Sequence, residues 1–245
     1  MEVVINRRLV LKMNYISVIS GEMNSLYRVI KVLNNQNIKY KIKGNILLHF
    51  LQYEAECDRY FRGTQDIDLF TEHKDIEKLK RSIELLYPDC QVITTDEGVV
   101  KRIKNINQFN LSQIDISSTN NLDLKDEFTS LYTLEDQTFY GNSTEGIFRD
   151  KIRSISSISV SRRFKDVIDV FILKDMLDMT DSELKYRLNK YKIGNFEQYF
   201  KKETIIAKEQ FKGFVSKEND ITIDNIYNKM SEIIRGSVGD CLEWK

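Results

Sequence analysis

Two aspartates separated by a single residue, Asp66 and Asp68, lie in a segment that alternates apolar and polar side chains. The alternation over residues 65–71 predicts a strand with Ile67 and Leu69 facing inward, and its period of two places both carboxylates on the other face. Carboxylates this close repel each other unless a cation lies between them. Mg²⁺ prefers oxygen ligands and bridges to substrate phosphates, so the pair predicts a magnesium site.

A third carboxylate extends this hypothesis. Asp115 lies in a second predicted strand, residues 111–117, between the apolar residues Ile114 and Ile116. On a strand next to the first, it would allow two ions to bind roughly 3.5–4 Å apart, the arrangement used for in-line phosphoryl-type transfer. The competing interpretation is that Asp-x-Asp is only the polar face of an edge strand.

A glycine turn precedes the carboxylate pair. Residues 38–43 predict a strand, Gly44-Asn45 a turn, and residues 46–53 a buried helix. A glycine turn at a helix N-terminus offers backbone N–H groups and a positive dipole to phosphate oxygens, and Asn45 can cap such a helix. The turn and the carboxylate pair together indicate a site for a nucleoside triphosphate.

These residues carry a resemblance. The segment from Lys41 to Phe70 begins Lys-Ile-Lys-Gly-Asn and ends Arg-Gly-Thr-Gln-Asp-Ile-Asp-Leu-Phe. It resembles the opening motif of the nucleotidyltransferase superfamily that includes DNA polymerase β. More narrowly it is similar to the AbiEii toxin family of minimal nucleotidyltransferases, in which Arg-x-Thr-x-Asp-Ile-Asp-Leu recurs. That family usually has Gly-Gly or Gly-Ser where this chain has Gly44-Asn45.

A second block supports the same resemblance. Phe148 to Arg153 supplies a lysine on one predicted helix, and Arg163 to Asp169 reads Arg-x-Lys-Asp-x-x-Asp on the next. Both are similar to the helical motifs of the AbiEii family. Lys151 and Lys165 are compact cations suited to triphosphate charge, and Arg163 can bind oxygens in a bidentate way. The alternative for each is a solvated helix face paired with carboxylates.

Asp166 and Asp169 are three residues apart on one helix face and could orient Arg163 or Lys165. A role for Asp166 as catalytic base is the alternative. Arg62 either contacts phosphate or braces the turn before Asp66, and the sequence leaves both readings open. We therefore expect catalytic roles for Asp66, Asp68, Asp115, Lys151 and Asp166, with the first three as metal ligands, and nucleotide contacts from Gly44, Asn45, Arg62, Thr64, Lys151, Arg163 and Lys165.

The order of elements predicts an α+β fold with a small mixed sheet and flanking helices in residues 1–140, followed by an all-helical lobe in residues 141–245. Helical spacing of apolar residues marks residues 22–35 and 74–86, and further strands are expected at residues 90–94 and 99–103. The C-terminal helices are expected at residues 147–157, 161–176, 182–190, 196–214 and 223–234.

The bulk composition narrows the setting of this chemistry. The 37 basic and 37 acidic side chains cancel, so net charge does not indicate a nucleic-acid partner, although a local basic groove remains possible. No apolar stretch reaches the length of a membrane span, and no signal peptide is recognisable. The three scattered cysteines have no metal-ligand spacing, and His49 is expected to be a core residue. We expect a cytoplasmic protein.

The resemblance implies the activity: Mg²⁺-dependent transfer of a nucleoside monophosphate from an NTP to an acceptor hydroxyl, with release of pyrophosphate. It also implies a toxin of a bacterial toxin–antitoxin or phage-defence system, with RNA, including tRNA, as acceptor and an antitoxin protein as partner. Two alternatives remain open. One is a small-molecule nucleotidyltransferase of the antibiotic-modifying kind, and the other is a non-catalytic nucleotide-binding protein with a degenerate phosphate site.

Overall fold

The computed structural model describes residues 21–54, 60–62, 64, 66–95, 100–108, 111–157, 164–190, 214–216 and 223–235. The chain divides into two compact units, one formed by residues 1–51 and 63–143 and the other by residues 52–62 and 144–245. Within the described ranges, no helix is both long enough and apolar enough to cross a lipid bilayer.

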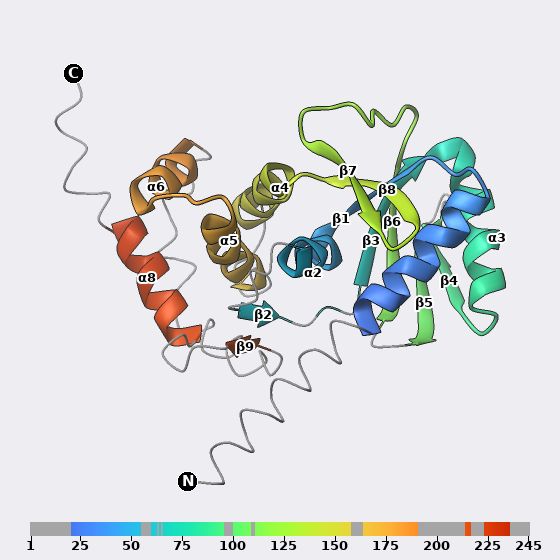
Figure 1. The fold of residues 1–245 in the computed structure, drawn as a ribbon, viewed down its shortest axis with the longest axis horizontal. Coiled ribbons are helices and arrows are strands. Elements are labelled where there is room, and N and C mark those ends of the chain that lie inside the picture. Colours follow the sequence, from blue (N-terminus) through green and yellow to red (C-terminus); the bar gives the residue numbers. More distant parts are fainter. Residues whose placement is uncertain are drawn as a thin grey trace, which may run out of the picture. The chain divides into compact units, whose positions relative to one another are not determined.

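The first unit is built on a mixed sheet, which over the described residues has seven strands in the order β4-β5-β6-β3-β1-β8-β7 (Figure 1). β3 pairs antiparallel with β1 and parallel with β6, and β1 pairs parallel with β8. This mixed sheet with its helices confirms the predicted α+β class. The strands are β1 Tyr40–Lys43, β3 Asp66–Glu72, β4 Gln91–Thr94, β5 Val100–Gln108, β6 Leu111–Thr119, β7 Thr129–Leu134 and β8 Gln137–Asn142.

Three α-helices accompany this sheet. They span residues 21–35 (blue in Figure 1), α2 Gly44–Glu54 and α3 Ile76–Leu86, the last preceded by a short 3₁₀ turn, His73–Asp75. The first helix buries an apolar stripe at the predicted spacing, and α3 does the same. The stripes consist of Leu26, Val29, Ile30 and Leu33 in the first helix and of Ile76, Leu79 and Ile83 in α3.

The two faces of the sheet differ sharply in polarity. Residues that stand opposite each other in paired strands share a face. Ile67, Leu69 and Ile114 are fully or almost fully buried on one face, whereas their neighbours in sequence lie on the other. That second face carries charged and amide side chains from four adjacent strands. By register these are Lys41, Lys43, Asp66, Asp68, Arg102, Lys104, Gln113 and Asp115.

Two strands of the sheet are absent from the sequence prediction. β7 and β8 form an antiparallel pair joined at Glu135-Asp136, with Glu135 at a φ of 55°. The turn lacks the Asn-Gly or Asp-Gly pair that usually announces a two-residue hairpin. β8 ends at Asn142 and α4 begins at Thr144, so the change from strands to helices falls here.

The second unit is mainly helical. Its described helices are α4 Thr144–Ser157, α5 Phe164–Met176, α6 Asp181–Lys190 and α8 Ile223–Arg235. It also contains one element that the prediction of an all-helical lobe did not include. The short strand β9, Phe214–Ser216, pairs antiparallel with β2, Tyr60–Arg62, a segment about 150 residues earlier whose partner no local pattern identifies. The helix expected over residues 196–214 otherwise lies outside the described residues.

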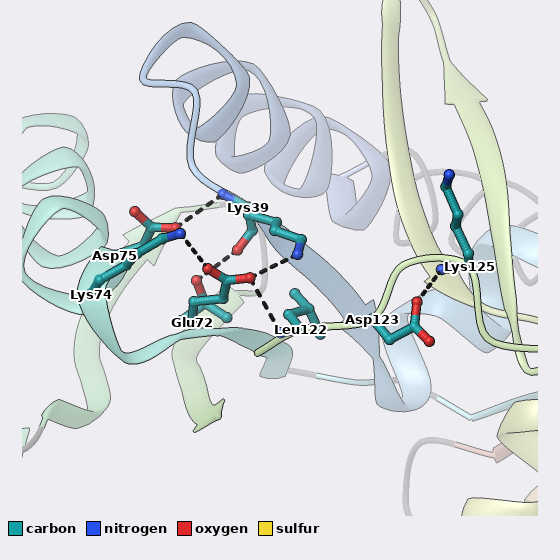
Figure 2. Close-up of polar contacts among 8 residues, drawn as sticks. Lys39, Glu72, Lys74, Asp75, Leu122, Asp123 and Lys125 are labelled. Atoms are coloured by element: carbon teal, nitrogen blue, oxygen red, sulfur yellow. Dashed lines mark hydrogen bonds and ion pairs between the residues drawn. The ribbon is translucent and has the colours of Figure 1, made fainter. Parts of the chain in front are cut away.

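A buried carboxylate ties together one end of the sheet. The Glu72 side chain, at the end of β3, accepts hydrogen bonds from Lys39 Nζ at 2.7 Å and from the backbone N–H of Leu122 at 3.2 Å, and it pairs with Lys74 Nζ at 2.6 Å (Figure 2). Lys39 lies just before β1, Lys74 lies in the turn before α3, and Leu122 lies in the loop after β6. Hydrogen bonds from Lys39 and Lys74 lower the pKa of Glu72 to about 2.

We expect Glu72→Gln to flatten the acid limb of the stability curve. The folded-state pKa lies below the ordinary value of 4.5, so the ionised carboxylate stabilises the fold above that pH, and this contribution is lost as pH falls towards 2. Urea unfolding at a series of pH values between these limits measures the effect, with the exposed Glu127→Gln as the matched control. A Glu72→Gln curve parallel to that of the wild type would contradict the prediction.

Candidate functional site

The three predicted carboxylates lie on the polar face of the sheet. Asp66 and Asp68 alternate with the buried Ile67 and Leu69 in β3, as the period of two requires. Asp115, in β6, stands directly opposite Asp68 in the parallel β3–β6 pair. All three side chains are half-buried. The structure therefore places at one surface the carboxylates that the sequence assigned to metal binding.

A cation that the sequence analysis missed is bound to this cluster. Arg102 of β5 stands opposite Asp115, and its guanidinium contacts both carboxylate oxygens, with Nη2 3.0 Å from Oδ2 and Nε on Oδ1. Gln113 Nε2 also donates to Asp115, at 3.3 Å. The hydrogen bond that Arg102 donates to Asp115, and then the charges of Asp115, Asp66 and Asp68, raise the pKa of Arg102. Arg102 is thus a counter-ion for the whole cluster.

The carboxylates of Asp66 and Asp68 fit a magnesium site. Mg²⁺ typically takes one or two protein carboxylates, which these two residues can supply, and completes its shell with water and substrate phosphates. Among the residues that the structure describes, no three His, Cys, Asp or Glu side chains are arranged as a metal site. Asp115 is hydrogen-bonded to Arg102 through both carboxylate oxygens, so a metal ion at Asp115 would compete with the Arg102 guanidinium.

The glycine turn lies directly against the carboxylate of Asp68. Gly44 follows the last residue of β1 and opens α2 with a φ of 72°, a conformation that L-residues rarely adopt. Because Lys43 pairs with Asp68, a Cβ on Gly44 would lie 1.8 Å from Asp68 Oδ2. Glycine is therefore required twice, by backbone conformation and by the close approach of the carboxylate. The N-terminal N–H groups of α2 begin beside Asp68.

Asn45 and Thr64, for which the sequence predicted nucleotide contacts, both hydrogen-bond to protein groups. The Asn45 side chain is buried, and its Nδ2 lies 2.7 Å from Nε2 of His49, one turn further along α2. The Thr64 backbone N–H donates to Glu22 Oε1 at 3.2 Å, and its Oγ1 accepts from the Asp66 N–H at 3.5 Å. Both residues thus hydrogen-bond to protein groups around the site, and their contacts with nucleotide stay predictions.

The second unit holds the later motif residues. Lys151 of α4 is 9% exposed, and its Nζ lies 3.0 Å from Asp166 Oδ1 and 2.6 Å from Asp169 Oδ2, both on α5. The two aspartates are buried and hold Lys151. That they also orient Arg163 or Lys165 stays a prediction. Lys165 is half-buried on α5.

Two predicted nucleotide contacts fall where the structure gives no side chain. Arg163 lies outside the described residues, and Arg62 is described only as the backbone of β2. Their proposed contacts with nucleotide remain predictions from the sequence.

Comparisons with known proteins add the following. No protein-family model and no curated protein sequence matches this chain. Among solved structures it is similar to an antigenic nucleotidyltransferase-like protein from Paracoccidioides brasiliensis, with a TM-score of 0.48, 16% identity, and coverage of 77% of this chain and 92% of that one. It is also similar to ANT(2")-Ia in complex with adenylyl-2"-tobramycin, with a TM-score of 0.47, 13% identity, and coverage of 69% and 96%. A solution structure of the antibiotic-resistance factor ANT(2")-Ia gives a TM-score of 0.46 at 13% identity, covering 73% of this chain and 95% of that one. These values are too low to assign an activity or a family.

We expect Gly44→Ala to damage the site and the fold together. The positive φ alone costs about 1–2 kcal/mol for an L-residue, and the added Cβ must displace Asp68. Urea unfolding and magnesium–nucleotide titration measure the two effects. Gly141→Ala is the matched control, because its Cβ would meet the side chains of Leu47 and Tyr132 at 2.9–3.1 Å without touching a carboxylate. Nucleotide affinity equal in the two variants would contradict this view of Gly44.

Lys151→Met is expected to destabilise the protein by about 3–5 kcal/mol, because it leaves two buried carboxylates without their cation. The triple variant Lys151→Met/Asp166→Asn/Asp169→Asn removes all three charges and should recover part of this loss. Chemical denaturation of both variants measures the difference. A single variant as stable as the wild type would show that the ion pairs contribute little and would favour a ligand-binding role for Lys151.

Proposed function

We propose that this protein is a Mg²⁺-dependent nucleotidyltransferase that transfers a nucleoside monophosphate from an NTP to an acceptor hydroxyl. The observation that carries the proposal is the close approach of a glycine turn to the carboxylate of Asp68 in the first unit. Gly44 opens α2 against the Asp68 carboxylate, and Asp66 projects from the same strand face. The backbone that would bind phosphate thus follows β1, and the oxygens that would bind metal lie on the adjacent strand β3.

Each group has a definite task under this proposal. Asp66 and Asp68 would hold magnesium, which when bound neutralises phosphate charge and activates the acceptor oxygen. The first N–H groups of α2 would bind phosphate oxygens. Arg102 keeps Asp115 and the neighbouring carboxylates partly neutralised in the protein without ligand. Lys43 lies on the same face, with its Nζ 4.2 Å from the centre of the Phe70 ring, which fixes a cation beside Asp68.

The acceptor is proposed on the sequence motifs. The resemblance of residues 41–70 and 148–169 to the AbiEii family supports RNA, including tRNA, as the acceptor, within a toxin–antitoxin or phage-defence pair with an antitoxin partner. A small-molecule acceptor is the competing assignment, since the same carboxylates would serve it, and fold alone does not select a substrate.

Calorimetric titration of each NTP with and without Mg²⁺ tests the proposal. The wild type is expected to bind at least one NTP only when the metal is present, and Asp66→Asn/Asp68→Asn should lose that binding, because both metal-ligand charges are removed while side-chain shape is kept. Asp89→Asn, at an exposed turn, is the matched control for a lost aspartate. A well-folded wild type that binds no NTP would overturn the proposal.

The same proteins separate the possible acceptors. Incubation with labelled NTP should transfer label to RNA with the wild type and not with Asp66→Asn/Asp68→Asn, and expression of the wild type alone should arrest bacterial growth. Label on an aminoglycoside and not on RNA would replace the toxin assignment by the small-molecule one. Metal-dependent NTP binding without transfer to either acceptor would indicate a nucleotide-binding protein.

A further inference from the structure

A buried histidine lies behind the candidate site with a partner on each ring nitrogen. His49 is 1% exposed, its Nδ1 lies 2.6 Å from Glu22 Oε2, and its Nε2 lies 2.7 Å from Asn45 Nδ2. Glu22 and Asn45 are themselves 3% and 6% exposed. The second oxygen of Glu22 accepts the Thr64 backbone N–H at 3.2 Å. Four residues from three separate segments thus form one continuous chain of hydrogen bonds.

The donors and acceptors of this hydrogen-bond network indicate the form of the His49 imidazole. An ionised carboxylate only accepts hydrogen bonds, so Nδ1 must carry the proton that faces Glu22. An amide NH₂ only donates, so Nε2 must present its lone pair to Asn45. With the Asn45 amide in this orientation, the pattern fits an imidazole that is protonated at Nδ1 only. With the amide turned round, its oxygen would face Nε2 and the pattern would fit an imidazolium.

This network of hydrogen bonds connects the elements that the proposed function needs to hold together. Glu22 belongs to the first helix, Asn45 follows the glycine turn at the start of α2, and Thr64 lies two residues before Asp66. Among the described residues, the pairing of β1 with β3 ends at Lys43 and Asp68, short of both Thr64 and the first turn of α2. The carboxylate of Glu22 and the ring of His49 bridge that gap with short, desolvated hydrogen bonds, which are stronger in a buried setting than in water.

We propose that Glu22, His49 and Asn45 form a positioning network that fixes the first turn of α2 and the backbone before Asp66 in the arrangement that binds an NTP. The inference rests on the proposed function. His49 does not touch the nucleotide; it acts through Asn45, whose side chain it draws inward so that the backbone N–H groups of the turn face the phosphates. Neutral, Nδ1-protonated His49 is the state that performs this.

The protonation state is measured directly by nitrogen NMR on protein with isotope-labelled histidine. The chain has only two histidines, so the variant His73→Gln, with its substitution outside the network, leaves the His49 signals alone in the spectrum. We expect one protonated nitrogen, Nδ1, and one with a free lone pair, and Asn45→Ala should shift the Nε2 signal and leave Nδ1 nearly unchanged. Protonation of both nitrogens, or of Nε2 alone, would overturn the assignment.

The positioning role is measured by magnesium–NTP titration of Glu22→Gln, His49→Gln and the double variant. Loss of a group that orients a ligand-binding residue typically weakens affinity by roughly tenfold or more, and members of one network should not be additive, so the double variant should lose no more than the worse single one. Ser25→Ala is the matched control: it removes a buried hydrogen bond to Gly21 O from the helix that carries Glu22 but lies outside the network.

The outcomes separate this inference from the function on which it rests. Wild-type affinity in Glu22→Gln and His49→Gln would overturn the network and leave the nucleotidyltransferase proposal standing. A loss equal to that of Ser25→Ala, or one that follows thermal stability alone, would show a merely structural role and also overturn it. No NTP binding by the wild type would overturn both proposals, even if the NMR assignment of His49 were met.

Discussion

The antiparallel pairing of β1 with β3 governs the geometry of the candidate site. It sets Lys43 opposite Asp68, so the residue after Lys43 must turn away directly over a carboxylate. Only glycine can make that turn at a φ of 72° without a side chain in the way. The start of α2, the direction of its N–H groups and the position of Asp68 follow from this one register, and a shift by a single residue would move every side chain of β3 to the other face.

The two faces of the sheet have different roles. The buried face, with Ile67, Leu69 and Ile114, supplies the apolar surface that stabilises the first unit. The other face gathers carboxylates and cations whose charges are balanced locally, chiefly by Arg102 on Asp115. Glu72 binds three donors at the far end of β3, which fixes that end of the strand that carries Asp66 and Asp68.

Local periodicity was enough to predict the parts of this arrangement that depend on neighbours in sequence. The alternation in β3, the apolar stripe of the first helix and the glycine turn at Gly44 all follow from short-range rules, and the structure agrees with them. The contacts that were missed join residues far apart. The contact of Arg102 with Asp115 can be recognised only once the β5–β6 register is known, and His49 and Glu22 are 27 positions apart in the sequence. β7 and β8 were not predicted because Glu135, and not a glycine, adopts the positive φ of their turn.

The contact between Gly44 and Asp68 also bears on how such a sequence can change over generations. While Asp68 is present, any side chain at position 44 collides with it, so the two positions cannot vary independently. Were Asp68 replaced by alanine, the collision with the carboxylate would be removed. A tight contact of 3.2 Å with the Cβ at position 68 and the backbone penalty of about 1–2 kcal/mol would still oppose substitution of Gly44. Loss of the carboxylate therefore makes loss of the glycine less costly. A lineage in which position 44 has acquired a side chain while position 68 remains aspartate would have to have moved that carboxylate or rebuilt the turn.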